Sequence, residues 1–447
     1  MAERTDTNRY GGWSAKKFES AGYFRVEHDG TRWWLVTPGG NAFLSFGVNH
    51  YHWFWWNQDY NREYWLKKFG AKEPRDQAWV SGYRSMASND AAYLGLNTLG
   101  IHTDPGILTG VDPILPFVAR FDPVDIPHYK VAGPEKFPDI FSLDFDRQCD
   151  SKARELVKPL ANEPGVLGFS MTDCPIFTDE DARERGMTVY GAPRPELPTW
   201  PRLLRNSGAS SDGKQKYVHC VRKLHRNNIS SFNSVYSTDF ASWDSLASAT
   251  NWRERTDYNN ETELRDNTEF LRECVDTYYR KAKEALRRYD NNHLFFGDKI
   301  NANTNTLDTV LDITVSHTDI VFYQMYARYP DQQKVLDRWT SRIDKPFLNG
   351  DSSFSFVSEM MPHPYGPHAD DQRERAQWTK EFVESAFART DFVGWHICGI
   401  LDSWKIMAGK SDKQHAGLMS PTGDYYPEME RTVRDLSDRL YKIATNQ

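Results

Sequence analysis

The sequence predicts an α/β protein built as a single (β/α)₈ barrel, or TIM barrel, with long βα loops. Short apolar segments alternate with segments of helical periodicity, which is typical of βα units around a mainly parallel sheet. Eight strand-like segments are centred near residues 45, 97, 168, 234, 295, 322, 348 and 394, and 447 residues suffice for eight such units with insertions. No Gly/Ser linker, charge block or repeat divides the chain, which favours one large domain.

The N-terminal segment predicts a β-hairpin ahead of the barrel. Residues 23–26 and 33–36 have strand-like patterns, and His28-Asp29-Gly30 between them is a turn signal. We expect residues 1–40 to form this hairpin as a lid or plug, and residues 41–447 to form the barrel.

Strands and helices then alternate to the C-terminus. We expect strands at 42–48, 96–100, 166–171, near 234, 293–297, 320–326, 346–350 and 392–397. Helical patterns end at Gly95 and occupy 144–161, 213–228, 263–289, 331–342 and 370–389. The polar segment 178–212, rich in Pro, Arg and Asp, is longer than an ordinary loop, which favours a functional role.

Composition excludes several classes of function. A net charge of −7 disfavours a protein that binds nucleic-acid backbones, and the absence of an apolar run of about 18 residues predicts no membrane span. The five cysteines lack CxxC spacing, which indicates reduced thiols, and the N-terminal residues lack the apolar core of a secretory signal. We therefore expect a cytoplasmic protein without nucleic-acid or membrane partners, and fold-level analogy allows a homo-oligomer.

Polar and aromatic residues cluster around the predicted strand ends, where barrels carry their sites. The candidate ligand-binding residues are Asn49, His50, Asn97, Cys174, Asp298, Lys299, Tyr323, Tyr326, Trp395 and Trp404. Amides, carboxylates and aromatic rings are typical of a carbohydrate site, and aromatic residues make up 14% of the chain. The nucleotide motifs GxGxxG and GxxxxGKS/T do not occur, and we expect no cofactor.

Several segments carry a family resemblance, and they occur in a consistent order along the chain. They are 24–26, 33–40, 43–50, 95–100, 137–141, 289–294 and 345–350. Together they resemble the β-agarase-type glycoside hydrolases of family 50, a branch of the clan A barrels. The resemblance covers most of residues 20 to 430 and fades in 178–212. It implies a glycosidase that acts on a galactan-like or acidic oligosaccharide or polysaccharide.

Both catalytic glutamates implied by this resemblance are replaced. In that family an Asp-Asn-Glu tripeptide with the general acid/base follows the strand matching 166–171, where this chain has Asp173-Cys174-Pro175. The family nucleophile follows the glycine that matches Gly350, where this chain has Asp351. We predict Asp351 as nucleophile or base and Asp173 as acid. Cys174, at the acid/base position, is inert packing, a poor proton donor or the mark of a non-hydrolytic role.

The shorter aspartates leave the stereochemical course open. Retaining glycosidases hold their carboxyl groups about 5–5.5 Å apart and inverting ones about 6.5–9.5 Å. Loss of one methylene at Asp351 favours a wider gap, toward the inverting range, while an aspartate nucleophile in a retaining mechanism is equally compatible with the sequence. Each carboxylate also has a purely structural interpretation: Asp351 suits a helix cap, and Asp173 suits an ordinary turn.

The other candidates have roles implied by the barrel and the clan. Either Tyr323 or Tyr326 is expected to bond the nucleophile while the other is core, and Trp395 and Trp404 form an aromatic floor or pack in the core. Asp298 and Lys299 form an ion pair or bind a sugar hydroxyl or carboxylate. The segment 178–212 and Trp53–Trp56 would wall the cleft and favour exo action on short chains.

Other classes of function compete with hydrolysis. His50-Tyr51-His52 at the end of the first strand is a pattern that holds metal in some barrel hydrolases, but later histidines are not convincingly placed, so we expect no metal. The altered glutamates also suit a glycan-binding barrel without activity, or a lyase on an acidic sugar with Lys299, a histidine or a tyrosine as base.

Overall fold

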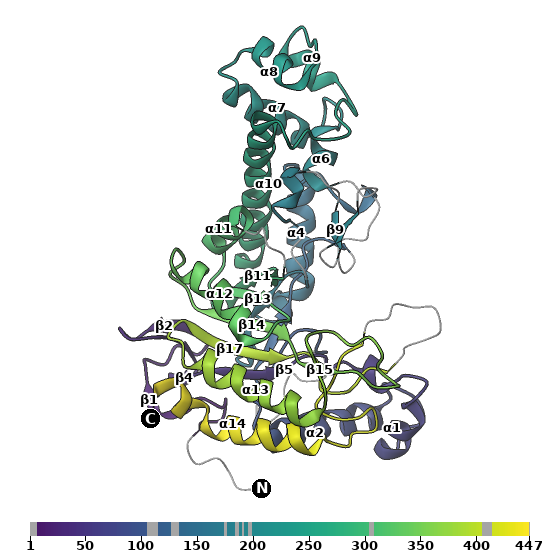
Figure 1. The fold of residues 1–447 in the computed structure, drawn as a ribbon, viewed down its shortest axis with the longest axis vertical. Helices are drawn as coiled ribbons and strands as arrows, with labels where there is room; N and C mark the ends of the chain where they lie inside the picture. The colour runs from purple at the N-terminus through teal and green to yellow at the C-terminus, as the bar shows by residue number, and fades with distance from the viewer. Residues whose placement is uncertain are drawn as a thin grey trace.

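The structure is a computed structural model that describes residues 7–104, 115–126, 134–173, 177–183, 187–189, 192–194, 199–303, 308–404 and 414–446. Figure 1 shows an elongated molecule in which a sheet with its surrounding helices forms the lower part. The long helix α10 (Glu261–Arg287) rises from this part to a helical extension at the upper end. None of the helices in the described ranges combines the length and apolar character needed to cross a membrane.

A parallel sheet of nine strands forms the centre of the lower part. Its order is β11-β8-β7-β6-β5-β17-β14-β13-β12, and each neighbouring pair is parallel. The strands are β5 (Ser45–Val48), β6 (Thr98–Leu99), β7 (Phe117–Arg120), β8 (Val166–Ser170), β11 (Leu294–Gly297), β12 (Ile300–Asn301), β13 (Val321–Gln324), β14 (Phe347–Ser352) and β17 (Phe392–Ile397). Because the strands are parallel, their carboxyl ends meet at one edge of the sheet.

The sheet curls until its two outer strands adjoin. β11 and β12 are separated in the chain only by Asp298 and Lys299, and β11 also contacts β13. Gly297 ends β11 with φ of 69°, a left-handed conformation that glycine adopts without steric cost. The chain therefore bends at Gly297, so that β11 pairs with β8 and β12 pairs with β13.

Helices cover the outer face of the sheet. They are α1 (Arg62–Phe69), α2 (Gln77–Leu94), α4 (Leu143–Leu156), α11 (Asp308–His317), α12 (Tyr329–Thr340), α13 (Gln372–Phe387) and α14 (Pro427–Thr445). Side-chain caps at Asp76, Ser142 and Asp371 accept backbone N–H groups at the starts of α2, α4 and α13. Smaller elements are β15 (Ser355–Phe356), β16 (His368–Ala369) and the 3₁₀-helices Trp53–Trp56, Pro134–Lys136 and Lys158–Leu160.

The N-terminal hairpin is part of a four-stranded antiparallel sheet of order β1-β4-β3-β2. Its strands are β1 (Trp13–Lys17), β2 (Arg25–His28), β3 (Trp33–Val36) and β4 (Asn41–Phe43). Trp33 N–H donates to Thr390 O at 2.8 Å, and the Arg32 guanidinium donates to the carbonyls of Phe387, Phe392 and Ala444. Because Phe392 begins β17, these contacts place the sheet at the amino end of the strands, in the manner of a plug.

The predicted strand near residue 234 is wrong. Residues 229–236 form the helix α8, which Asn228 caps and Ser237 ends in a left-handed conformation. The apolar positions Phe232, Val235 and Tyr236 follow helical spacing, which explains the helix in place of the expected strand. The missing strand is β7, at residues 117–120, which the sequence reasoning overlooked.

The helical extension is built from the chain between β8 and β11. It contains α6 (Trp200–Arg205), α7 (Asp212–Leu224), α8 (Ile229–Tyr236) and α9 (Trp243–Ser248). Contacts with α10 hold α6, α7 and α8 in place, and α9 packs on α7 (Figure 1). The segment 178–212, expected as a long loop, contains α5 (Glu180–Arg183), the antiparallel pair β9 (Met187–Val189) and β10 (Ala192–Arg194), and α6.

Replacing Arg32 tests how the N-terminal sheet is anchored. Arg32→Ala leaves three backbone carbonyls without their charged donor, and we expect the free energy of unfolding to fall by about 3 kcal/mol. Urea unfolding measures the change. The control Lys17→Ala removes an exposed cation from β1 of the same sheet and should change stability by less than about 0.5 kcal/mol. Equal effects of the two substitutions would contradict the anchoring role.

Candidate active site

Charged side chains from several strand ends meet at the carboxyl edge of the sheet. Lys299, in the bend between β11 and β12, forms ion pairs with Asp173, which follows β8, and with Asp351 of β14. Only 1% of the Lys299 side chain is exposed, against 9% for Asp173 and 7% for Asp351. One buried ammonium therefore bridges the two carboxylates that the sequence nominates for catalysis.

Asp351 is held by donors from three elements. Its Oδ1 accepts from Asn49 Nδ2 at 2.9 Å and from the Tyr326 hydroxyl at 3.1 Å, and its Oδ2 accepts from Lys299 Nζ. Burial has the largest single effect and raises the pKa of the Asp351 carboxyl, but the Lys299 ammonium and the nearby His102 together keep this pKa below its ordinary value. Asp351 is therefore an ionised carboxylate of fixed orientation.

Asp173 has a histidine as its second partner. His102 Nε2 lies 3.1 Å from Asp173 Oδ1, and 23% of the His102 side chain is exposed. Ligand atoms of His102, Asp173 and Asp351 all lie within 4.8 Å of one another. An oxygen of Asp173 and an oxygen of Asp351 thus lie within 4.8 Å of each other.

Asp298 holds the bend that carries Lys299. Its Oδ1 accepts from Thr172 N at 3.0 Å and Thr172 Oγ1 at 2.7 Å, and its Oδ2 accepts from the Tyr279 hydroxyl at 2.8 Å. Lys299 itself pairs with the two catalytic candidates, Asp173 and Asp351. Asp298 therefore positions the ends of β8 and β11 relative to each other.

Asn49 contacts two parts of the opposite strand. Besides Asp351, its Nδ2 donates to Gly350 O at 2.8 Å. Its side chain also requires glycine at position 100, because a Cβ there would lie 1.8 Å from Asn49 Oδ1. The close approach of Asn49 explains why Gly100, the last residue of the expected strand 96–100, carries no side chain.

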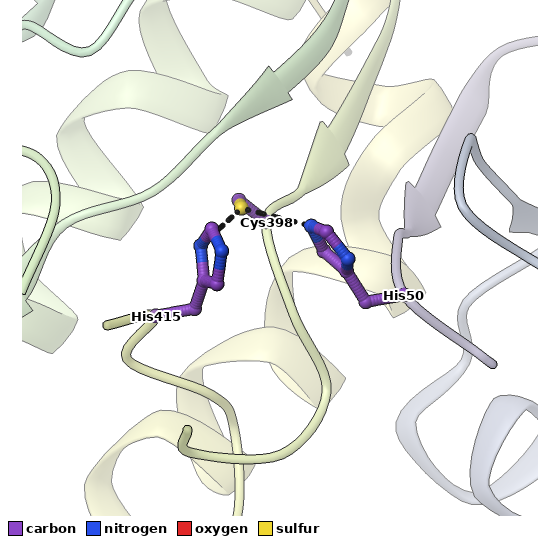
Figure 2. Close-up of side chains that lie close together, drawn as sticks. All are labelled: His50, Cys398 and His415. Atoms are coloured by element: carbon purple, nitrogen blue, oxygen red, sulfur yellow. Dashed lines mark hydrogen bonds between the residues drawn. The ribbon is translucent and has the colours of Figure 1, made fainter. Parts of the chain in front are cut away.

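A second cluster, made of His50, Cys398 and His415, lies beside the carboxylates. Cys398 Sγ is 3.0 Å from His415 Nδ1 and 3.5 Å from His50 Nε2 (Figure 2). Burial lowers the pKa of His50 well below its ordinary value and that of His415 to about 4, and it raises the pKa of the Cys398 thiol. At neutral pH the cluster therefore consists of neutral imidazoles and a neutral thiol.

Two histidines at strand ends have left-handed backbones. His50 has φ of 65° and His102 has φ of 60°, a region that side chains other than glycine adopt at a cost. Their rings stack at a centroid distance of 4.6 Å and an angle of 13°. The stack connects the cluster at Cys398 with the carboxylate pair, because His102 also contacts Asp173.

Three of the predicted ligand-binding residues lie away from this site. Asn97 precedes β6 and bonds Leu44 O and Phe46 N, both at 2.8 Å, so it lies at the amino end of the sheet. Tyr323 is buried against Trp339, which leaves Tyr326 as the tyrosine that bonds Asp351.

Trp395 is the third predicted ligand-binding residue that lies away from the site. Side chains alternate along β17, and this alternation points Trp395 away from it. The Trp395 ring is buried between Phe46 and Phe382 of α13, on the helix-facing side of the strand, while its neighbour His396 bonds Ser45 Oγ at 2.8 Å. Trp395 is therefore core and no sugar floor. Trp404 lies 5.5 Å from the Tyr60 ring, and Cys174 falls outside the described residues.

The predicted Trp53–Trp56 segment divides between core and site. Trp56 is buried against Tyr51 and Tyr83, whereas Trp55 is half-buried with its ring 5.4 Å from that of His50 and 5.7 Å from that of His415. Trp55 therefore borders the cluster at Cys398.

Sequence reasoning missed four residues of this region as site residues. His102 and Cys398 follow β6 and β17, so their strand-end positions were available as a signal. Asp122 follows the overlooked strand β7, and burial raises the pKa of its carboxyl to about 6. His415 follows no strand of the sheet, and only the folded chain brings it to Cys398.

The chain resembles known agarases in sequence and in fold. It is 23% identical over 367 residues to β-agarase A and 20% identical over 499 residues to β-agarase B, both of Vibrio sp. (strain JT0107). These matches cover 78% and 97% of this chain but only 35% and 50% of the relatives, so the chain spans a third to a half of their length. No family model matches the chain.

Solved structures show the same fold. An exo-β-agarase superposes with a TM-score of 0.81 at 17% identity, over 99% of this chain and 69% of that one. PfGH50B gives 0.79 at 18% identity over 98% and 69%, and the agarase AgWH50C gives 0.78 at 18% identity over 98% and 68%. The resemblance to the β-agarase-type hydrolases of family 50 is thus confirmed, with an α/β fold similar to theirs.

Removing the bridging ammonium tests the electrostatics of the site. Lys299→Met leaves the buried Asp351 and the partly buried Asp173 without their cation, and we expect a loss of about 3–5 kcal/mol of unfolding free energy at pH 7. Without the ammonium, burial and the neighbouring Asp173 raise the pKa of the Asp351 carboxyl above its unfolded value of about 3.9, so the variant regains stability as this carboxyl takes up a proton between pH 7 and pH 4. The deficit of the variant should therefore shrink between pH 7 and pH 4 in urea unfolding.

The matched control is Lys216→Met, which breaks a surface ion pair with Glu273. Its cost should stay below about 1 kcal/mol. A Lys299→Met deficit that equals the control, or that is unchanged at pH 4, would refute the bridging role.

Proposed function

We propose that this chain is a glycoside hydrolase that cleaves a galactan-like or acidic oligosaccharide or polysaccharide with two aspartates. The observation that carries the proposal is the pair of Asp351, which is buried, and Asp173, which is partly buried, at the carboxyl edge of a parallel sheet, with oxygens that approach within 4.8 Å. The fold shared with agarases supports the same class of substrate. With β11 and β12 adjoining, we also propose that the sheet closes as a (β/α)₈ barrel.

The short separation favours a retaining mechanism, since an inverting one needs room for a water between sugar and base. Asp351 Oδ attacks the anomeric carbon, and the bond from this carbon to the leaving oxygen breaks. The leaving oxygen takes a proton from the acid. The sugar is then joined to Asp351 as a glycosyl ester. In the second step the deprotonated acid accepts a proton from water. The water oxygen attacks the anomeric carbon and releases the Asp351 carboxylate.

Asp173 acts as the acid together with His102. The 3.1 Å contact between His102 Nε2 and Asp173 Oδ1 lets one proton be shared between the two groups, and the partly exposed His102 ring connects them to solvent. Asp173 is shorter than the expected glutamate. His102 gives it a second group through which a proton reaches the leaving oxygen.

Aromatic side chains near the carboxylates suit a sugar ligand. Trp55 and Tyr365 both lie beside His415, at ring distances of 5.7 and 5.4 Å, and Tyr365 also lies 5.8 Å from Tyr326. Such rings bind the apolar faces of sugars. We propose that they hold the terminal residues of a short chain, which corresponds to exo action.

A second function, glycan binding without cleavage, is favoured by one observation. The Lys299 ammonium occupies the position between the two carboxylates and neutralises part of their charge. A sugar that cannot displace this ion pair would bind beside it without reacting. Hydrolysis and binding are distinguished by the same experiment.

The experiment compares wild type, Asp351→Asn and Asp173→Asn on a panel of neutral and acidic galactan oligosaccharides. We expect Asp351→Asn to lower kcat/KM by about 10³-fold or more and Asp173→Asn by about 10²-fold or more, because they remove the nucleophile and the acid. Proton NMR of the first product should show a retained anomeric configuration. The control Asp370→Asn changes an exposed aspartate and should leave the rate unaltered.

Three outcomes would contradict the proposal. Hydrolysis insensitive to both substitutions would exclude the two-aspartate mechanism. A product with a new ultraviolet absorbance would indicate an unsaturated sugar and a lyase. Saturable oligosaccharide binding by the wild type without any turnover would establish the glycan-binding alternative.

A further inference from the structure

The cluster of His50, Cys398 and His415 brings together three groups that bind metal ions. They come from positions far apart in the chain: the end of β5, the end of β17 and the segment before α14. The ligand atoms of the three residues lie within 4.8 Å of one another, and the rings of His50 and His415 flank Cys398 Sγ (Figure 2). The two-aspartate reaction uses none of these three side chains.

The separations match those around a tetrahedral zinc ion. With bond lengths of about 2.0–2.1 Å to nitrogen and 2.3 Å to sulfur, tetrahedral geometry sets nitrogen and sulfur about 3.5 Å apart. The observed distances from Cys398 Sγ are 3.5 Å to His50 Nε2 and 3.0 Å to His415 Nδ1. A cation therefore fits between these atoms after shifts of a few tenths of an ångström.

The backbone holds each of the three residues in place. His50 N–H donates to Ile101 O at 3.2 Å, Cys398 N–H to Ser352 O at 3.0 Å, and His415 N–H to Ser403 Oγ at 2.7 Å.

The ring of His50 is also fixed from outside the cluster. Its left-handed backbone, with φ of 65°, and its stack on His102 set the plane in which Nε2 faces Cys398. A strained backbone that the surrounding structure maintains is common at functional sites. The three ligand atoms are thus preorganised rather than free to diverge.

We propose that His50, Cys398 and His415 bind a thiophilic divalent cation, of which Zn²⁺ is the probe, with a fourth position open to water or another ligand. One thiolate and two imidazoles select zinc-like ions over Ca²⁺ and Mg²⁺, which prefer oxygen ligands. On binding, the Cys398 S–H bond breaks, its electron pair forms the bond to the metal, and one proton leaves to solvent. This site revises the expectation of no metal.

The HxH pattern of the sequence contributes only one of its two histidines. His52 accepts from Phe54 N–H at 3.3 Å as the cap of the 3₁₀-helix Trp53–Trp56, and its ring lies 5.7 Å from Trp53. Because His52 lies two residues after His50 but contacts other groups, it offers a matched control for the histidine variant of the cluster. Cys220, a buried cysteine of α7, offers a matched control for Cys398.

The experiment uses the full chain, stripped with a chelator, reduced and titrated with Zn²⁺ alone by calorimetry. We expect one ion per chain, affinity lowered by about 100-fold or more in Cys398→Ser and His415→Ala, and unchanged affinity in His52→Ala and Cys220→Ser. Co²⁺ in place of Zn²⁺ should give a thiolate-to-cobalt charge-transfer band with the wild type, which tests the ligation without any variant. Zn²⁺ should also raise the Tm of the wild type and of both controls.

Absence of a saturable ion on the reduced wild type would overturn the proposal, and so would a cobalt spectrum without a thiolate band. Equal zinc affinity of the wild type and of a Cys398→Ser variant that unfolds cooperatively would do the same. Oligosaccharide hydrolysis is no readout here, so a failure of the two-aspartate mechanism leaves this result unaffected.

Discussion

One buried ammonium group holds the candidate site together. Lys299 Nζ pairs with Asp173, which follows β8, and with Asp351 of β14, and the like charges of the two carboxylates could not remain close together inside the protein without it. The position of Lys299 depends in turn on the bend at Gly297 and on Asp298, which bonds Thr172 and Tyr279. The curl of the sheet and the geometry of the carboxylates therefore depend on the same two residues. Asp298 and Lys299 join β11 to β12, and they supply the support and the ammonium.

Two clusters of different chemistry share the carboxyl edge of the sheet. One contains oxygen acids and an ammonium, and the other contains soft nitrogen and sulfur ligands around Cys398. They meet at the stacked rings of His50 and His102, the second of which contacts Asp173. The first cluster already holds a cationic group, and we propose acid–base work for it; for the second, whose nitrogen and sulfur atoms lie within 4.8 Å of one another, we propose a metal. The fold is that of agarases, but the residues at its edge differ from the pair of glutamates expected there.

Much of the scaffold could be predicted because its signals are local. Apolar runs located seven of the eight expected strands, and strand-end positions nominated Asp351, Asp173, Lys299 and Asn49, which the structure brings together. The failures have physical causes. Helical spacing at 229–236 was taken for a strand, Asn97 begins its strand instead of ending it, and Trp395 faces the helices because side chains alternate along β17. His415 had no local signal, since its role arises only when distant segments meet. The bridging of two carboxylates by one lysine likewise arises only in the folded chain.

The coupling between Lys299 and Asp351 is the quantity on which this arrangement depends most directly. A double-mutant cycle with Lys299→Met, Asp351→Asn and the combined variant, followed by urea unfolding at pH 7, measures it. If the ammonium stabilises the buried carboxylate, the second substitution should recover much of the stability lost in the first, with a coupling free energy of about 2 kcal/mol or more. Effects that add to within about 0.5 kcal/mol would show that the two groups do not interact and that the site is organised in some other way.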